Sequence, residues 1–292
     1  MDARADVMLI DDGSTQLPPE TMATGIGRLS IIQILHLRRN IGHQRAICIA
    51  LCHLREFSKC TRVLVMDGDG EDDPADIPRL SGGLDASQGA RIVFAERTKR
   101  SEGWRFVLFY RIYLLLHRVL VGHHVRVGNF SMMTRECLES ICVAPELWNH
   151  YAACAFATRQ VVATVSTNRA KRLRGESKMN FPALVMHGLS ALSVFSDRIF
   201  TKLLILSAAA TAATVFGLVV VTLIRVMTDY AIPGWATSAF GILLLLLLQL
   251  GTFIFNFCFL VLLTRSSSPF IPLRDYKFFI LRITEVERGE ES

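Results

Sequence analysis

Residues 61–73 read TRVLVMDGDGEDD, an apolar run that ends in a dense acidic turn. The branched aliphatic residues predict a buried strand, and the glycines and aspartates that follow predict the loop at its end. Residues 5–15, which read ADVMLIDDGST, show the same order of apolar run and acidic turn. The two segments therefore predict two strands that each end in a carboxylate-rich loop.

The segments between the predicted strands have helical spacing of apolar residues. Strands are predicted at residues 5–10, 31–37, 61–66 and 91–95, and helices at residues 41–55 and 77–84. Strands that alternate with helices indicate an α/β fold with a doubly wound, mostly parallel sheet. Ligands bind at the carboxyl ends of the strands in such sheets, which is where both acidic turns fall. Asn40 stands before the first helix and is its predicted N-cap.

The acidic turn after residue 66 points to a cation. It holds the carboxylates of Asp67, Asp69, Glu71, Asp72 and Asp73. Carboxylates this close repel one another, and their pKa values rise unless a cation neutralises them. Mg²⁺ or Mn²⁺ suits oxygen ligands and would take one or two carboxylates together with phosphate oxygens of a nucleotide. A solvated acidic loop without a metal is the alternative that this turn alone leaves open.

Two long uncharged stretches occupy the C-terminal part of the chain, at residues 203–224 and 231–264. At a rise of about 1.5 Å per residue, the first spans about 33 Å as a helix, which exceeds a hydrocarbon core of about 30 Å. The sequence therefore predicts a hairpin of two membrane spans, with residues 225–235 as its turn. Two buried core helices are the alternative.

Basic residues at the outer ends of this hairpin are Arg198, Lys202, Arg265 and Arg274. The positive-inside rule puts these ends, and hence the main domain, on the cytosolic side. Residues 104–121 and 181–200 are apolar but interrupted by charge, so they are predicted to lie as amphipathic helices in the headgroup region. Packing against the protein's own core is the alternative for both.

The chain is basic, with a net charge of +6, which favours lipid headgroups, phosphorylated substrates or nucleic acid. No nucleic-acid-binding motif occurs, so nucleic acid is not an expected partner. A cationic run just before the predicted membrane end comprises Arg169, Lys171, Arg172, Arg174 and Lys178. A lipid phosphate would arrive there; a membrane-surface anchor without catalysis is the alternative.

The seven cysteines are odd in number and form no C-x-x-C pair. Neither a disulfide framework nor a zinc site is therefore expected, and the thiols are predicted to be reduced and mostly buried.

Five motifs in this chain resemble those of glycosyltransferase family 2, and they occur in the family's order. They are the DDGS turn at residues 11–14, the RN-x-G helix start at 39–42, the D-x-D loop at 67–69, the GDF-like segment at 128–130 and the R-x-x-G-x-SK loop at 172–178. The resemblance implies a GT-A catalytic domain. It is strongest to the polyprenyl-phosphate branch, which includes dolichol-phosphate mannosyltransferase and bacterial polyprenyl-phosphate glucosyltransferases with a two-span tail.

The resemblance implies a role for each matched residue. The nucleotide sugar would contact Asp11, Asp12, Asn40, Gly42 and Asp67. The metal would bind Asp67 and Asp69, of which Asp69 is the more direct ligand. The diphosphate or the lipid phosphate would be held by Arg172, Arg174, Ser177 and Lys178. The implied catalytic set is Asp69, Asn129, Arg172 and Lys178.

The chain departs from the family's pattern in two places. The family's opening strand has no counterpart, so the predicted sheet lacks its first strand. Asn129 stands where the family has an aspartate. A carboxylate base contributes about 10²–10⁴ in rate when a hydroxyl attacks, whereas a phosphate acceptor is already anionic and needs no base. Asn129 therefore favours a phosphate acceptor, which it would orient through hydrogen bonds.

The sequence as a whole predicts a metal-dependent glycosyltransferase. It would move a sugar, with inversion, from a nucleotide-sugar donor to a polyprenyl-phosphate lipid at the cytosolic face of a membrane, most naturally the inner membrane of a bacterium. The predicted layout is a GT-A-like domain at residues 1–180, an amphipathic juxtamembrane helix at 181–202, a two-span hairpin at 203–264 and a cytosolic tail at 265–292.

A truncated, non-catalytic membrane partner of an active homologue is the alternative that remains. A processive polysaccharide synthase is disfavoured, because the chain has only two predicted spans and no Q-x-x-R-W motif. A homo-oligomer is left open.

Overall fold

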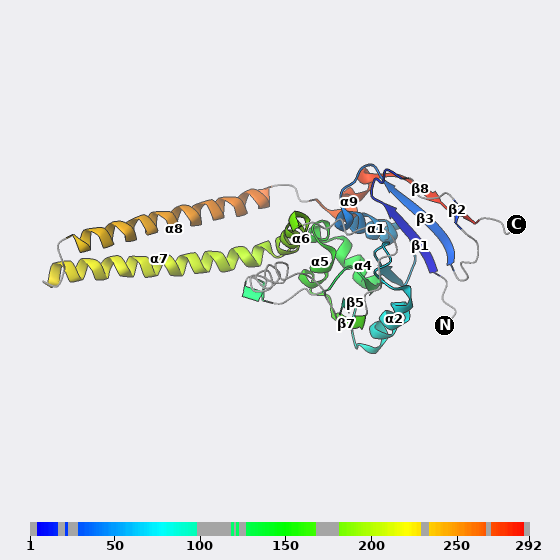
Figure 1. Cartoon of the computed structure of the whole chain (residues 1–292), viewed down its shortest axis with the longest axis horizontal. Coiled ribbons are helices and arrows are strands. Elements are labelled where there is room, and N and C mark those ends of the chain that lie inside the picture. The colour runs from blue at the N-terminus through cyan, green and yellow to red at the C-terminus, as the bar shows by residue number, and fades with distance from the viewer. Residues whose placement is uncertain are drawn as a thin grey trace. The chain divides into compact units, whose positions relative to one another are not determined.

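The computed structural model describes residues 5–16, 21–22, 29–97, 118–119, 121–122, 127–167, 181–228, 234–266 and 270–288. These residues form strands, helices and, toward the C-terminus, two long apolar helices, which confirms the predicted α/β fold class with a helical hairpin (Figure 1). They divide into two compact units. The first draws on residues 1–114, 123–194 and 270–292, and the second on residues 115–122 and 195–269.

The first unit contains a three-stranded sheet in the order β1-β3-β8. Its strands are β1 (Ala5–Asp11), β3 (Leu29–Leu37) and β8 (Ile280–Glu285). β1 and β3 run parallel, with Asp11 opposite His36, so that both strands end at the same edge. β8 pairs antiparallel with the other side of β3. A short parallel pair, β2 (Thr21–Met22) and β9 (Glu287–Arg288), accompanies this sheet.

A four-stranded sheet in the same unit has the order β4-β6-β5-β7. Its strands are β4 (Arg62–Val65), β5 (Ile92–Arg97), β6 (Ser131–Thr134) and β7 (Val162–Thr167). β5 and β7 run parallel, while β6 runs antiparallel to both of its neighbours. The start of β6 therefore lies at the same edge as the ends of β4 and β5.

Two hydrophobic clusters are buried between these sheets and their helices. The helices are α1 (His43–Phe57), α2 (Ile77–Ala86), α4 (Arg135–Cys142), α5 (Tyr151–Ala157), α6 (Phe181–Ser193) and α9 (Pro272–Asp275), with the 3₁₀ turns η1 (Pro74–Asp76), η2 (Pro145–Trp148) and η3 (Tyr276–Phe279). The buried face of α1 belongs to one cluster with Leu35 of β3, Val63 of β4 and Ile92 of β5. This helix therefore links the two sheets through one hydrophobic core.

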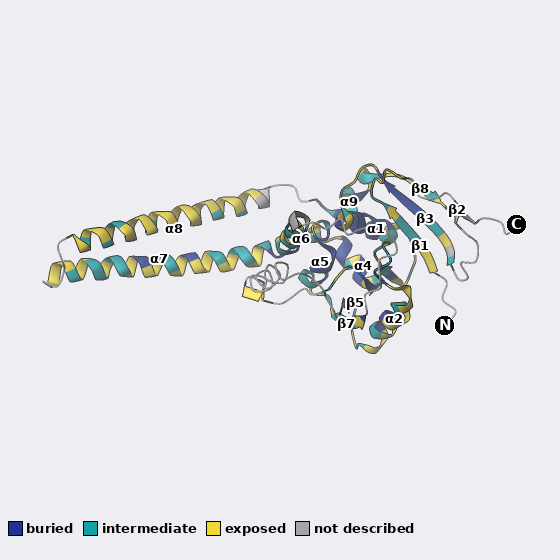
Figure 2. Ribbon diagram, viewed as in Figure 1, coloured by how far each residue is buried: buried dark blue, intermediate teal, exposed yellow. Residues whose placement is uncertain are grey.

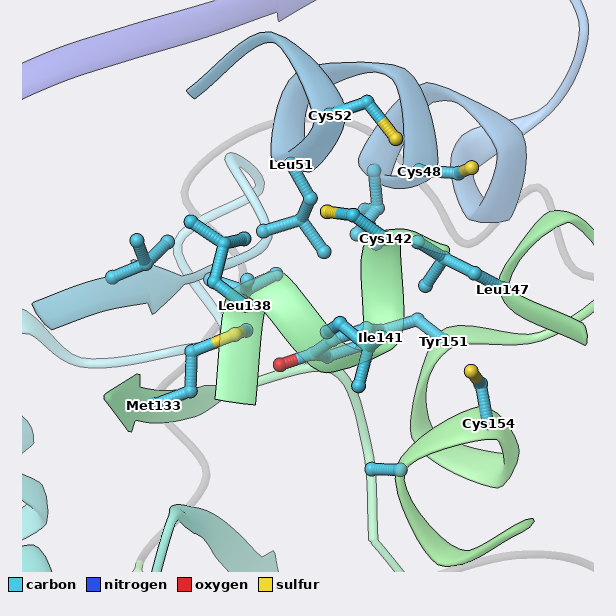
Figure 3. Close-up of a cluster of buried hydrophobic side chains, with 14 of the residues drawn as sticks. Cys48, Leu51, Cys52, Met133, Leu138, Ile141, Cys142, Leu147, Tyr151 and Cys154 are labelled. Atoms are coloured by element: carbon cyan, nitrogen blue, oxygen red, sulfur yellow. The ribbon is translucent and has the colours of Figure 1, made fainter. Parts of the chain in front are cut away.

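Figure 3 shows the centre of that core, where α1 meets α4 and α5 around Leu51, Leu138 and Tyr151. Five of the cysteines are buried, and none of the seven forms a disulfide. Burial raises the pKa of the Cys137 thiol to about 12, so this side chain stays neutral. The prediction of mostly buried thiols is confirmed.

The predicted strands and helices of the first hundred residues are confirmed, with bounds that agree to within about two residues, as is usual for element ends. Two details are wrong. The sheets are mixed rather than mostly parallel, because β6 and β8 run antiparallel to their neighbours. In addition, Asn40 is not the N-cap of α1. Gly42 occupies that position, and glycine has no side chain that could cap the helix.

The second unit consists mainly of α7 (Ser196–Met227) and α8 (Trp235–Ser266). Both helices are long and apolar enough to cross a membrane. Most of their apolar side chains are exposed or partly exposed, as the yellow and teal of Figure 2 show. Phe200 and Phe257 pack edge to face with ring centroids 5.0 Å apart, which joins the two helices. The helix predicted at residues 181–202 is interrupted at residues 194–195, where α6 ends and α7 begins.

Candidate functional site

The first turn of α1 is the place where the two acidic turns meet. The loop after β3 enters α1 through Ile41 and Gly42, whose backbone N–H groups donate to Asp12 Oδ1 and Oδ2 at 2.8 and 2.9 Å. Gln44, the second residue of the helix, donates to Asn129, which in turn contacts Asp67. The helix start therefore ties the turn after β1 to the turn after β4.

Asp12 takes the capping role that the sequence assigned to Asn40. Its carboxylate accepts from the N–H of Gly42, the N-cap residue, which has no partner within the helix, and from the N–H of Ile41 just before it. A negative charge at this end also interacts favourably with the helix dipole. The contact requires the two loops to approach closely at Gly13. A Cβ built at Gly13 would lie 2.6 Å from the backbone nitrogen of Asn40.

Asp11 is held by the protein on both of its oxygens. Oδ1 accepts from the backbone N–H of Ser14 at 2.9 Å, and Oδ2 lies 3.0 Å from His36 Nδ1. His36 Nε2 lies 3.1 Å from Thr284 Oγ1, so the chain of contacts crosses all strands of the three-stranded sheet. Partial burial works to raise the pKa of Asp11, but the hydrogen bonds from Ser14 and His36 outweigh it and lower the pKa. Its predicted role at the nucleotide stays a prediction.

Several carboxylates of the second acidic turn shape the loop itself. Asp72 is only 4% exposed and accepts from the backbone N–H of Asp67 at 3.0 Å. Asp69 Oδ1 accepts from the N–H of Glu71, and Asp73 Oδ1 accepts from the N–H of Ala75 at the start of η1. These local bonds explain part of the acidic run without a cation.

Asp67 faces Asn129 because of the strand register. Val65 pairs with Ser131, and the antiparallel register continued for two residues puts Asp67 opposite Asn129. Asn129 Nδ2 lies 3.3 Å from Asp67 Oδ1. Burial raises the pKa of Asp67; the hydrogen bond from Asn129 opposes this, and the nearby charges of Asp72 and Asp69 add to the rise. A half-buried carboxylate that prefers a positive neighbour is what a cation site needs.

Polar side chains hold Asn129 in place through hydrogen bonds. Gln44 Nε2 donates to Asn129 Oδ1 at 2.9 Å, while Gln44 Oε1 accepts from the backbone N–H of Tyr151 at 2.8 Å. Ser131 Oγ donates to the backbone carbonyl of Asn129 and lies 2.6 Å from the Tyr151 hydroxyl. The amide is therefore held by α1, by β6 and by the start of α5.

No role was predicted for Gln44 from the sequence. Its signal was available, because Gln44, Ile47, Cys48 and Leu51 fall at the spacing of one helix face. A polar residue on an otherwise apolar, buried face needs a partner, and here the partners are Asn129 and Tyr151.

A pair of histidines lies beside this network and was also missed. His150 Nε2 and His187 Nε2 are 3.3 Å apart, which connects the start of α5 to α6. His150 Nδ1 accepts from the backbone N–H of Ala153 and so caps α5. Burial lowers the pKa of His150 to about 3 and that of His187 to about 4. Both rings are neutral at physiological pH.

A cation beside Asp67 and Asp69 would need ligands from a substrate or from water. Within the described part of the chain, no group of three or more His, Cys, Asp or Glu side chains is placed to enclose a metal. Asp67 and Asp69 stand at the end of β4, and phosphate oxygens of a substrate would complete the shell of Mg²⁺ or Mn²⁺. Arg172, Arg174, Ser177 and Lys178 lie outside the described residues, so their roles stay predictions.

Comparison with known proteins finds relatives over most of the chain, although no family model matches. The uncharacterised glycosyltransferase YkcC of Bacillus subtilis is 24% identical over 261 residues, which cover 85% of this chain and 78% of the relative. A prophage bactoprenol glucosyl transferase homolog of Escherichia coli is 25% identical over 254 residues, or 84% and 78%. The bactoprenol glucosyl transferase of Shigella phage SfX is 26% identical over 204 residues, or 67% and 64%. These relatives confirm the resemblance to glycosyltransferases that the motifs predict.

Proposed function

We propose that this chain is a membrane-anchored glycosyltransferase of family 2, which moves a sugar from a nucleotide-sugar donor to a polyprenyl-phosphate lipid. The observation that carries the proposal is the junction at the first turn of α1, where Asp12 and the Asp67–Asn129 pair are connected. It brings the nucleotide turn and the D-x-D turn to one helix start. The bactoprenol glucosyl transferases among the relatives support the lipid acceptor.

Residue roles follow from this arrangement. Asp67 and Asp69 would hold Mg²⁺ or Mn²⁺, and the ion, when bound, would neutralise charge on the departing nucleoside diphosphate. Asp12, already fixed by two backbone amides, supports the turn over which the nucleotide would lie. Arg172 and Lys178 would meet the phosphates, since cationic side chains hold phosphate oxygens most strongly.

Asn129 favours one chemical class of acceptor over another. Its side chain has no titrating group, so it cannot remove a proton from an attacking hydroxyl. A lipid phosphate is already anionic, and attack in line on the anomeric carbon would invert the configuration there. The amide contacts the carboxylate of Asp67 at the place where donor and acceptor would meet.

The two long helices support a membrane location for this reaction. α7 and α8 would anchor the chain as a two-span hairpin. The basic residues at their outer ends, Arg198 and Lys202 among them, would set the catalytic domain on the cytosolic side. A lipid phosphate in that leaflet would then lie on the same side of the membrane as the catalytic domain.

The test is sugar transfer by membranes that contain the full chain. They are given polyprenyl phosphate, Mg²⁺ or Mn²⁺ and a panel of labelled nucleotide sugars, and label is counted in the lipid extract. We expect metal-dependent label with one donor. Asp69→Asn keeps an oxygen that can accept from the Glu71 N–H but removes the charge, so label should disappear.

Asp85→Ala is the matched control for the aspartate substitution. Asp85 pairs with Arg62 at the surface of α2, and exposed ion pairs of this kind contribute little to stability. The control should transfer as the unaltered chain does. Absence of label with every donor, from protein shown to be folded and inserted, would contradict the proposal and favour a non-catalytic membrane partner.

A further inference from the structure

Gln44 is a buried polar side chain on the apolar face of α1. It is 7% exposed, and its helix neighbours Ile47, Cys48 and Leu51 are all part of the hydrophobic core. A buried amide costs free energy unless each of its polar atoms has a partner. Gln44 satisfies this requirement with two partners that lie far away along the chain, Asn129 and Tyr151.

The partners fix which way each amide points. A backbone N–H can only donate, so the Gln44 atom that faces the N–H of Tyr151 must be the oxygen. Gln44 therefore turns its NH₂ group to Asn129 and must meet an oxygen there. The NH₂ group of Asn129 is left to face the carboxylate of Asp67. One backbone amide at the start of α5 thus determines the orientation of two side chains.

The opposite orientation of Asn129 is unfavourable on both of its sides. A rotated amide would turn its NH₂ group toward the NH₂ group of Gln44 and its oxygen toward the Asp67 carboxylate. Ser131 Oγ holds the backbone of Asn129, so the chain there is braced as well. The Asn129 side chain is consequently a fixed donor, aimed at the carboxylate that stands at the D-x-D turn.

We propose that Gln44 is a positioning residue, which holds the Asn129 amide with its NH₂ group toward Asp67. This inference rests on the proposed function, because the orientation of the Asn129 amide matters for activity only if sugar transfer takes place beside Asp67. Gln44 itself is behind Asn129 and acts through it. A site that is held in this way keeps a donor beside Asp67 whether or not substrate is bound.

Gln44→Glu and Gln44→Leu separate positioning from packing. Glutamate keeps the shape and the oxygen for Tyr151, but its ionised form offers Asn129 a second oxygen in place of the NH₂ group. Asn129 would then rotate. Leucine removes both hydrogen bonds and leaves the helix face apolar. A misplaced group at a reaction centre costs on the order of 10²-fold in rate, and we expect a loss of that size in transfer for both variants.

The pH dependence distinguishes the two variants. A protonated glutamate donates as glutamine does, and burial raises the pKa of such a carboxyl above its usual value of about 4.3. The ratio of Gln44→Glu activity to that of the unaltered chain should therefore rise as pH falls from 8 to about 5.5. The ratio for Gln44→Leu should stay constant. The neighbouring titratable groups Asp67, His43 and His150 are present in all chains, so Gln44→Leu supplies the reference for their effect on the ratio.

Gln160→Glu serves as the matched control. Gln160 donates to Ser140 and contacts none of the site residues through a described hydrogen bond. The same charge change there should leave both the activity and its pH profile unaltered.

A second measurement does not depend on transfer. Chain labelled with ¹⁵N at asparagine side chains shows the Asn129 NH₂ signals, which Asn129→Ala identifies by their loss. We expect these signals to shift in Gln44→Leu and, at pH 8, in Gln44→Glu, and to return toward their original position at pH 5.5 in Gln44→Glu. Unchanged Asn129 signals in both variants would overturn the positioning role. Absence of transfer in the unaltered chain would instead overturn the proposed function, while the amide signals would still decide this inference.

Discussion

Gly13 stands where the turn after β1 touches the loop before α1. Its φ of 66° is a conformation that side chains with a Cβ rarely adopt, and the added Cβ would meet backbone atoms of Arg39 and Asn40 below 3 Å. Backbone atoms cannot move aside as the end of a side chain can. The residue therefore joins two constraints that glycine alone satisfies.

We predict that Gly13→Ala destabilises the first unit by about 1–3 kcal/mol, the range for a strained backbone conformation. Thermal unfolding in detergent measures it. Gly82→Ala is the control, because Gly82 lies within α2 and a Cβ there meets nothing within 4 Å. Alanine at that helix position should be neutral or stabilising by up to about 1 kcal/mol. Equal unfolding temperatures for both variants would contradict the close approach at Gly13.

The lowered pKa values of His150 and His187 predict that the folded chain loses stability in acid. Burial lowers both pKa values below the unfolded value of about 6.5, so the unfolded chain binds more protons than the folded chain does. The stability that depends on their neutral forms is complete above pH 6.5 and is lost as pH falls toward 4. The loss amounts to up to about 1.4 kcal/mol per histidine for each pH unit in that window.

Unfolding measured between pH 7.5 and 5 tests this sign. His187→Gln removes one titrating ring while its amide oxygen can still accept from His150, so the acid loss should become smaller in that variant. A His150 ring proton that titrates near pH 6.5 in the folded chain would show that the ring is not held neutral, and the prediction would fail.

At the scale of elements, backbone N–H groups at the start of α1 donate to a carboxylate from a distant part of the chain. Asp12 accepts two N–H groups there, whereas Asn40, the cap expected from local sequence, makes no side-chain cap bond. Hydrogen bonds to a charged acceptor contribute about 1.5–3 kcal/mol each at most. We predict that Asp12→Ala lowers the free energy of unfolding by about 1–3 kcal/mol and that Asn40→Ala has little effect.

Chemical unfolding of the two variants side by side measures this difference. The reverse order of effects would mean that Asn40 caps the helix after all.

The elements that local sequence predicts are those with strong periodicity. Residues 31–37 and 41–55 show strand and helix patterns clearly, and β3 and α1 follow them. β6 was missed because it is only four residues long and takes its antiparallel place from its neighbours β4 and β5. β8 was missed because its partner β3 is far away in the chain, and no local pattern specifies pairing at that distance.

The residues of the candidate site also differ in whether the local sequence predicts them. Asp12, Asp67, Asp69 and Asn129 were found from motifs, since acidic turns after strands are visible in the sequence. Gln44, His150 and His187 depend on contacts between segments about 40 to 110 residues apart, which only the folded chain brings together.

At the scale of the whole molecule, the length and apolar surface of α7 and α8 predict that both helices insert into a membrane. Leu245 lies near the middle of α8 and is 69% exposed. Arginine at a helix centre costs about 2.5–3.5 kcal/mol on insertion scales, so Leu245→Arg should reduce the inserted fraction. Alkaline extraction of membranes and a protease-protection assay measure it.

Trp235→Arg is the control, because Trp235 begins α8 and an arginine there can reach the headgroups. Equal extraction of both variants and of the unaltered chain would contradict a spanning role for α8.

The pairing of β8 with β3 also sets an order of events during synthesis. His36 and its partner Thr284 are separated by 248 positions. At about 5–20 residues per second, the ribosome needs roughly 12–50 s to make the intervening chain, which includes both long helices. For that time the free side of β3 has no β8 beside it and exposes unpaired backbone groups. The three-stranded sheet is therefore completed only after α7 and α8 have been translated, so the first unit reaches its final form after the two long helices have been made.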